Sequence, residues 1–277
     1  MSQGVTASIV LYNHKVSEVA PLFQELARET ALGEWTVVNN GGAEDACALA
    51  ESLGARCLSP GRNLGFGGGH NLVLSQSSNI FKYHIVVNPD ISFNRGVIDD
   101  LYRFMEDHHD VGLVMPKIQY PDGTDQGLRK LLPAPADLIA RRFLGRMGNL
   151  LFRKRLESYE LKHIDLTSAC EVPCLSGCFM FLRSAVLREV GGFDERFFMY
   201  MEDVDLCRRI GAAAKCVYYP YAVVTHEYAQ GSYRNHRLLR YHAQSALRYF
   251  SKWGWLFDPQ GKALNRRAGK RVDSRRA

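Results

Sequence analysis

The chain has 277 residues, of which 46% are hydrophobic and 23% charged, an ordinary globular composition that can fill one large domain or two small ones. It has no apolar run of about 18 residues, and its N-terminus has neither a basic leader nor a cleavage-site pattern. We therefore expect no transmembrane helix and no signal peptide. The formal net charge is +6.

That charge is unevenly distributed. Residues 234–277 hold twelve Lys or Arg and two Asp, a local charge of +10, so the preceding residues sum to −4. Residues 141–155 carry six basic residues and no acid, interleaved with large apolar side chains. Such mixtures favour an anionic membrane surface as partner, with a solvated tail and nucleic acid as competing interpretations. Nucleic acid is disfavoured because no stripe of aromatic and basic residues of the single-strand-binding kind is present.

The seven cysteines are an odd number and are scattered among apolar neighbours, which predicts buried free thiols in a reducing cytosol. They are Cys47, Cys57, Cys170, Cys174, Cys178, Cys207 and Cys216. Three of them recur every fourth residue, but Pro173 interrupts the series and no histidine is near. A zinc or iron–sulfur site there is disfavoured.

The first hundred residues alternate between strand-like and helix-like patterns. Apolar runs at 6–13, 35–40, 55–59 and 83–90 are separated by amphipathic segments at 16–26 and 46–53 and by a glycine-rich turn that leads into a further helix. This alternation predicts βαβ units and a Rossmann-like, mostly parallel sheet of an α/β protein. Polar residues follow three of the strands: Asn13, Asn39–Asn40 and Asn88–Asp90. Since ligands bind beyond the carboxyl ends of such strands, we expect these residues to line one pocket.

The remainder is less uniform. Residues 116–172 show little pattern, 174–211 regain it, and a strand at 215–226 precedes a helix at about 236–252. The chain is expected to divide into two halves, 1–115 and 116–233, followed by a basic helix and tail (234–277).

The segment "GRNLGFGGGHN" (residues 61–71) is glycine-rich and contains Arg62, a cation suited to a diphosphate. It is either a phosphate-binding loop or a flexible turn before a helix. It follows the third predicted strand, not the first, which argues against an NAD-dependent enzyme.

The segment "FDERFFMYMEDVDLCRR" (residues 193–209) concentrates carboxylates after an apolar stretch. Asp205 is expected to pair with Arg209 one helical turn later and to be structural. Glu202 and Asp203 emerge from apolar surroundings that raise carboxyl pKa values, as base chemistry requires. His226 ends a strand, as Asp90 nearly does, and the two could share a divalent cation.

These motifs together are recognisable. In their order, "SIVLYN", "VVNNGG", "NLGFGGGHN", "VVNPD", "LSGCFMFLR", "GGFDERFFMYMEDVDLCRR" and His226 followed by Gly231–Ser232 make the chain resemble family 2 inverting glycosyltransferases of the GT-A fold. It is most similar to bacterial rhamnosyltransferases of O-antigen and cell-wall polysaccharide assembly, over residues 6–252.

The resemblance implies that residues 1–115 form the nucleotide-sugar-binding half and residues 116–233 the acceptor-binding and catalytic half of one GT-A domain. It also implies roles for individual residues. Asp90 and His226 would hold Mg²⁺ or Mn²⁺ on the donor diphosphate, with Asn88 in the place of the first Asp of the family's D-x-D motif. Asp203 would be the catalytic base, with Glu202 beside it. The implied donor-binding residues are Asn13, Asn39, Asn40, Arg62, Asn63, Gly65, Asn71, Asn88 and Asp90. The implied acceptor-binding residues are Gly177, Asp194, Glu195 and Tyr200.

The implied reaction is metal-dependent transfer of a sugar, with dTDP-L-rhamnose as the expected donor, onto a glycan or a sugar carried by a polyprenyl diphosphate. The enzyme would then lie peripherally on the inner face of the cytoplasmic membrane. There are two alternatives. The donor is another nucleotide hexose, or the protein is a non-catalytic module that binds sugar nucleotides. The sequence leaves the oligomeric state open, a homodimer included.

Overall fold

The computed structural model describes residues 4–76, 81–138, 152–227 and 236–272. The first half contains β1 (Val5–Leu11), α1 (Val16–Arg28), β2 (Leu32–Asn39), α2 (Glu44–Ser52), β3 (Arg56–Leu58), α3 (Gly65–Gln76), β4 (Tyr83–Val87), β5 (Ile91–Phe93), α4 (Val97–Asp107) and β6 (Val111–Gln119). The second half contains β7 (Arg129–Lys130), α7 (Arg153–Tyr159), β8 (Cys170–Glu171), β9 (Cys174–Leu175), β10 (Phe179–Arg183), α8 (Ser184–Glu189), α9 (Glu202–Ala213), β11 (Lys215–His226), α10 (His236–Trp253) and α11 (Pro259–Asn265).

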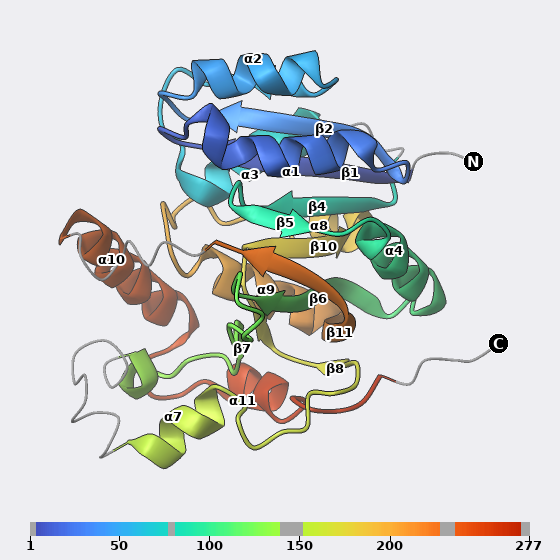
Figure 1. Cartoon of the computed structure of the whole chain (residues 1–277). Coiled ribbons are helices and arrows are strands. Elements are labelled where there is room, and N and C mark those ends of the chain that lie inside the picture. The colour runs from blue at the N-terminus through green and yellow to red at the C-terminus, as the bar shows by residue number, and fades with distance from the viewer. Residues whose placement is uncertain (1–3, 77–80, 139–151, 228–235, 273–277) are drawn as a thin grey trace.

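Within the described residues, nine strands form one mixed sheet in the order β3-β2-β1-β4-β10-β6-β11-β5, with β8 paired to β11 (Figure 1). The pairs β1–β2, β1–β4, β2–β3 and β6–β11 are parallel, as the alternating pattern predicted. Strand β10 is inserted antiparallel between β4 and β6. It therefore joins the nucleotide-binding half expected from the sequence to the second half through one continuous sheet.

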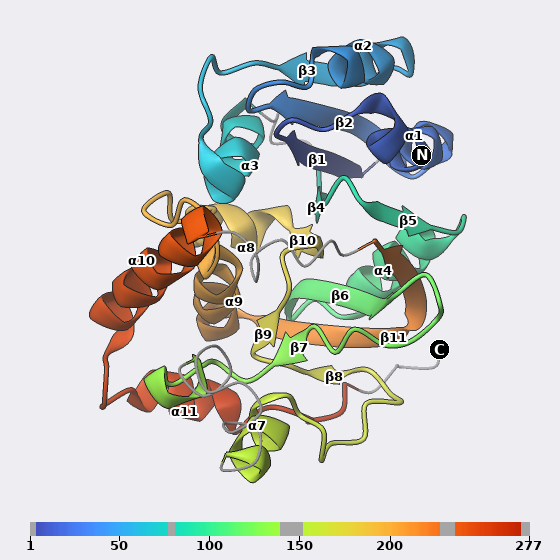
Figure 2. The same cartoon turned by 60° about the vertical axis from the view of Figure 1, so that its left-hand side comes forward.

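Helices cover both faces of this sheet. In Figure 2, α3, α8 and α9 lie on one face and α1 and α4 on the other. The two-sided cover buries β1 and β4 along nearly their whole length, which explains why both are mostly apolar. Their polar exceptions, Thr6, Ser8 and His84, are hydrogen-bonded to one another. Helices α1 and α4, which have one face to solvent, instead bury a stripe of residues three to four apart.

Helix α10 adds a second, smaller core beside the sheet. Its Tyr249 and Phe250 pack with Phe197, Met201 and Val204, which surround the start of α9. The hydroxyl of Ser245 also donates to the Met199 carbonyl at 2.8 Å. The basic C-terminal helix expected from the sequence is thus a support for the segment that begins α9.

The cysteine prediction is wrong for two of the seven residues. Cys47 on α2 and Cys57 on β3 form a disulfide, with Cα atoms 5.8 Å apart. The short connection folds α2 back along the strand that follows it, which brings the two side chains within bonding range. Among the described residues, the other five cysteines are buried thiols outside any disulfide, as expected.

Part of the basic segment at 141–155 and the Gly231–Ser232 pair of the family motif lie outside the described residues. The described end of that segment forms α7, where Arg153 pairs with Glu157 at 2.8 Å and Arg155 with Asp137 at 2.5 Å. Among the described residues, no helix has the length and hydrophobicity needed to cross a membrane.

Candidate active site

The carboxyl ends of β1, β2 and β4 meet at one edge of the sheet, as predicted. The amide of Asn40 donates to the Leu11 carbonyl at 2.8 Å, and that of Asn13 to the Gly41 carbonyl at 2.9 Å. The side chain of Asn13 is exposed in this cluster, in a left-handed conformation with φ of 56°. The Asn39 side chain accepts from the Gly41 amide and donates to Glu44. The first two polar clusters of the sequence are therefore in contact.

The glycine-rich segment is positioned by asparagines. Asn40 donates to the Gly65 carbonyl at 2.9 Å, and the Asn63 side chain accepts from the Gly65 amide at 2.8 Å. Gly65 has a φ of +77°, and a Cβ there would lie 2.1 Å from the Phe198 carbonyl oxygen. Close packing against the 193–198 segment therefore demands glycine, independently of any ligand. Arg62 is exposed beside this turn.

Asp90 and His226 lie together beyond the end of β4. The His226 Nε2 atom is 3.3 Å from Oδ1 of Asp90, and the imidazole is only 4% exposed. The pairing of β11 with β5, in which His226 faces Ile91, fixes this proximity. The structure thus joins the predicted strand-end carboxylate to the predicted strand-end histidine.

Gln126 orients that histidine. Its amide nitrogen donates to the His226 carbonyl at 2.7 Å, which leaves its amide oxygen to accept from Nδ1 at 2.9 Å. With the proton on Nδ1, the Nε2 lone pair faces Asp90. A carboxylate oxygen and an imidazole nitrogen so placed fit a divalent cation. The described residues offer no group of three His, Cys, Asp or Glu for a metal, so most ligands would come from a diphosphate and water.

Asp203 is held at the first turn of α9. Its two carboxylate oxygens accept from the amides of Gly177 at 3.1 Å and of Val204 at 2.8 Å. Tyr200 and Met201, immediately before the helix, both have a φ of +68°, an unusual conformation for residues other than glycine. This turn directs the first residues of α9 back toward Gly177.

The two neighbouring carboxyl groups differ in environment. Burial, and secondarily the charge of Asp203, raises the pKa of Glu202 to about 8, and Oε2 of Glu202 is buried without a hydrogen-bond partner. Burial also raises the pKa of Asp203, but the Gly177 and Val204 amides oppose this by stabilising its charged form. The charge of Asp203 therefore favours the protonated form of Glu202, while the Gly177 and Val204 amides favour the ionised form of Asp203.

Cys178 connects the two acidic sites. Its carbonyl accepts from the Asn88 amide at 2.8 Å, next to Asp90, while its neighbour Gly177 donates to Asp203. The buried Cys178 thiol has a pKa of about 12, raised by burial and also by the charges of both Asp90 and Asp203. The two carboxylates therefore flank one short segment of chain.

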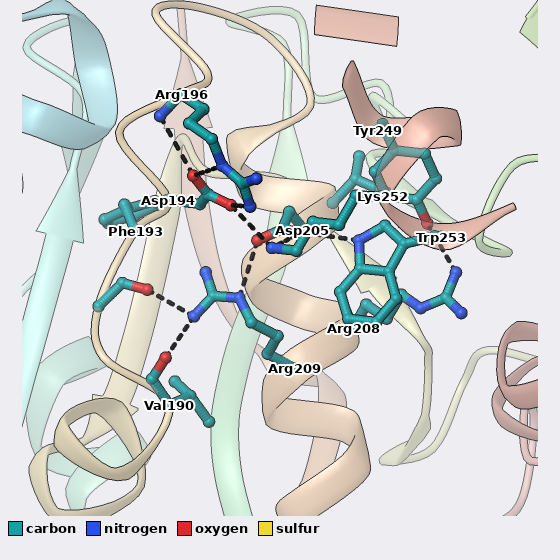
Figure 3. A network of polar contacts seen from close by, with 12 residues as sticks. Val190, Phe193, Asp194, Arg196, Asp205, Arg208, Arg209, Tyr249, Lys252 and Trp253 are labelled. Atoms are coloured by element: carbon teal, nitrogen blue, oxygen red, sulfur yellow. Dashed lines mark hydrogen bonds and ion pairs between the residues drawn. The ribbon is translucent and has the colours of Figure 1, made fainter. Parts of the chain in front are cut away.

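The other acids of the 193–209 segment are structural. Asp205 is fully buried and accepts from Arg209 at 2.8 Å, Lys252 at 2.7 Å and the Trp253 indole at 2.7 Å (Figure 3). The structural role predicted for Asp205 is confirmed. Asp194 pairs with Arg196 and Lys252, which hold the pKa of its carboxyl well below the usual range. Tyr200 packs against His242 of α10.

Asn71 and Glu195 lie elsewhere. The Asn71 side chain donates to Glu195 at 3.0 Å and to the Phe193 carbonyl at 2.8 Å. Both line a cavity of about 520 Å³ that reaches Thr6 and His84, near the amino ends of β1 and β4. The structure therefore does not bring these two predicted site residues to the carboxyl-end cluster.

A second cavity, of about 930 Å³, adjoins the site. It is lined by Gln126, which orients His226, and by Lys130 of β7, whose charge lowers the pKa of Asp203. Lys117 also lines it, and two ion pairs complete the charged wall, Arg129 with Asp125 at 2.7 Å and Lys162 with Glu160 at 2.7 Å. The sequence motifs did not point to these residues or to Gln126. They did not point to His14 either, whose imidazole feels the charge of Asp90. Only the fold, which pairs β7 with β9 and β6 with β11, brings them to the site.

Known proteins similar to this chain are glycosyltransferases. Residues 34–243 match the family described as "Glycosyltransferase like family 2". The chain is 31% identical over 212 residues to N-acetylglucosaminyl-diphospho-decaprenol L-rhamnosyltransferase of Mycobacterium tuberculosis (strain ATCC 25618 / H37Rv), covering 72% of this chain and 68% of that protein. It is 25% identical over 197 residues to rhamnosyltransferase WbbL of Escherichia coli (strain K12), covering 68% and 70%.

Solved structures share the fold at low identity. GalNAc-T7 with UDP, GalNAc and Mn²⁺ superposes with a TM-score of 0.65 at 12% identity, over 90% of this chain and 48% of that enzyme, so the present chain spans about half of its length. Mannosyltransferase PcManGT from Pyrobaculum calidifontis, with GDP-Man and Mn²⁺, gives 0.62 at 14% identity, over 95% and 68%. The chain belongs to glycosyltransferase family 2 and is a glycosyltransferase with the GT-A fold.

Proposed function

We propose that the protein is a metal-dependent inverting rhamnosyltransferase that uses dTDP-L-rhamnose and a lipid-linked sugar acceptor. The observation that carries the catalytic part is the placement of Asp90 and Asp203 on either side of the Gly177–Cys178 segment. One carboxylate can then serve the leaving group while the other serves the nucleophile. The two relatives named above as rhamnosyltransferases support the choice of sugar.

Asp203 takes the proton of the acceptor hydroxyl as its oxygen attacks the anomeric carbon. The amides of Gly177 and Val204 stabilise the ionised form of this carboxylate. The bond from the anomeric carbon to the diphosphate oxygen breaks as the new glycosidic bond forms, and this single displacement inverts the configuration. Glu202, protonated, places no second negative charge beside the base.

Asp90 and His226 hold the donor end of the site. They are the residues that would bind Mg²⁺ or Mn²⁺, and Gln126 keeps the His226 Nε2 lone pair available. A divalent cation bound there offsets the negative charge that develops on the departing diphosphate. Asn13, Asn39, Asn88 and Arg62 remain proposed donor contacts at this edge of the sheet.

We further propose that the acceptor lies in the cavity of about 930 Å³ beside Lys130. Lys117 and Lys130 on its wall are cations suited to the diphosphate of an acceptor such as the one named for the mycobacterial relative, whereas Arg129 and Lys162 are paired with Asp125 and Glu160. Such an acceptor would place the enzyme peripherally at the cytoplasmic face of the membrane.

The test is release of nucleoside diphosphate from a panel of nucleotide sugars, with and without an N-acetylglucosaminyl-diphospho-polyprenol acceptor and Mn²⁺. We expect acceptor-dependent release of dTDP from dTDP-L-rhamnose, and an inverted product linkage by NMR. Turnover of a different nucleotide hexose would reject the donor assignment, and absence of release from every donor would favour a non-catalytic binding module.

A further inference from the structure

Three consecutive large apolar side chains are exposed between α10 and α11. Trp255 is 46%, Leu256 95% and Phe257 78% exposed, and Leu247 on α10 is 56% exposed. Figure 2 shows the connection between these helices on the outer edge of the molecule. Single exposed apolar residues are common, but a contiguous group marks an interaction surface.

The turn that presents them is a fixed structure. Gly254 has a φ of +107°, and a Cβ at this position would lie 2.5 Å from the Phe257 carbonyl oxygen. Its amide donates to the Phe250 carbonyl at 2.8 Å, which ends α10. The chain therefore reverses tightly at glycine: the Trp255 ring packs on Phe250 with ring centroids 5.2 Å apart and keeps its outer side exposed, while Leu256 and Phe257 project into solvent.

Both ends of the turn are anchored to α9. On one side the Trp253 indole donates to the buried Asp205 at 2.7 Å. On the other, Asp258 forms a bidentate ion pair with Arg208 at 2.5 and 2.7 Å, and the Arg208 guanidinium stacks over the Trp253 ring at 4.1 Å. Figure 3 shows Trp253 and Arg208 in this arrangement. We call Trp255, Leu256 and Phe257 the apolar tip. Because both ends of the turn are anchored, folding of the tip onto the protein would break these contacts, so the tip stays exposed to a partner.

The surroundings of the tip are basic. Lys262 and Arg266 are exposed and four residues apart on and just after α11, and so lie on one face, while Arg248 is exposed near the end of α10. The acid closest in sequence, Asp258, is already paired with Arg208. Apolar and aromatic side chains beside cations match the headgroup region of an anionic bilayer.

We propose that Trp255, Leu256 and Phe257 insert into an anionic lipid bilayer, with Lys262 and Arg266 against the lipid phosphates. The inference deepens the proposed function, on which it rests for the presence of a lipid-linked acceptor in that bilayer. A second copy of the chain is a poorer occupant. A two-fold interface centred on the tip would bring the same cations of both copies together.

The experiment measures binding of the full chain to vesicles of phosphatidylcholine with or without phosphatidylglycerol, by sedimentation and tryptophan fluorescence. Trp35 is 5% exposed and Trp253 is partly buried and hydrogen-bonded, so a blue shift on binding reports mainly Trp255. We expect the shift with anionic vesicles. Leu256→Glu/Phe257→Glu should weaken partitioning at least ~10-fold, because the inserted apolar groups are replaced by charges. Lys262→Ala/Arg266→Ala should weaken it by roughly 10- to 30-fold on anionic vesicles only.

Tyr221→Glu is the matched control, since Tyr221 is 61% exposed on β11 and outside the tip; it should bind as the unmodified protein does. Unchanged binding of Leu256→Glu/Phe257→Glu would overturn the proposal, as would absence of binding by the unmodified protein. A dimer that this variant dissociates, with no vesicle binding, would assign the tip to a second copy. Vesicle binding needs neither donor nor acceptor, so the result is independent of whether glycosyl transfer is detected.

Discussion

The Nε2 atom of His226 lies 3.3 Å from Oδ1 of Asp90, and its other ring nitrogen is bonded to Gln126 at 2.9 Å. The three residues come from the end of β11, the turn after β4 and the loop after β6. Gln126 contacts neither the donor nor the metal in the proposed mechanism. It acts by positioning the imidazole.

Gln126→Leu should therefore raise the Mn²⁺ concentration needed for half-maximal activity by roughly 10- to 100-fold, the usual effect of losing a residue that orients a metal ligand. The maximal rate at saturating metal should fall much less. Gln76→Leu, at the end of α3, is the control and should leave the metal requirement unchanged. An equal loss of rate at every metal concentration would show that Gln126 does not act through His226.

Glu202→Gln should alter the pH dependence of stability. The pKa of Glu202 rises from an ordinary 4.5 to about 8 on folding, so the native state holds a proton that the unfolded chain loses. This favours folding fully below pH 4.5, and the contribution is lost as pH rises toward 8, by roughly 5 kcal/mol in total. Denaturant unfolding at pH 5 and pH 8 should show a smaller decline in the variant than in the unmodified protein. Equal declines would mean that Glu202 is not held protonated.

Asp205→Ala should cost about 3–5 kcal/mol of unfolding free energy, because it leaves Arg209 and Lys252 without their buried partner. Asp100→Ala, which removes an exposed pair with Arg103, should cost less than about 1 kcal/mol. Chemical denaturation of both variants gives the comparison. Similar small losses in the two would show that the Asp205 network does not stabilise the fold.

Much of the fold could be predicted from local pattern. The buried strands β1 and β4 are mostly apolar, and the strand at 215–226 has the bounds that the sequence predicted. The insertion of β10 antiparallel to β4 could not be predicted, since strand order depends on packing between distant segments. The Cys47–Cys57 disulfide was missed because the count and spacing of cysteines do not encode where a helix folds back.

Part of the site could likewise be predicted from sequence motifs, and part depends on the packing of distant segments. Asp90, Asp203 and His226 stand in recognisable motifs, and their resemblance to a family pointed to their roles. Gln126 and Lys130 lie in a segment without regular pattern and reach the site only through strand pairing. Asn71 stands in a motif too, but its side chain is used in hydrogen bonds to the 193–195 segment.

The central claim is that Asp203 is the base of a glycosyl transfer. The most direct test is turnover of dTDP-L-rhamnose by Asp203→Asn at saturating acceptor and Mn²⁺, with donor binding measured in parallel by calorimetry. The substitution keeps the size of the side chain, so donor affinity should be retained while kcat falls at least ~10²-fold. Near-normal turnover with normal donor binding would contradict the account.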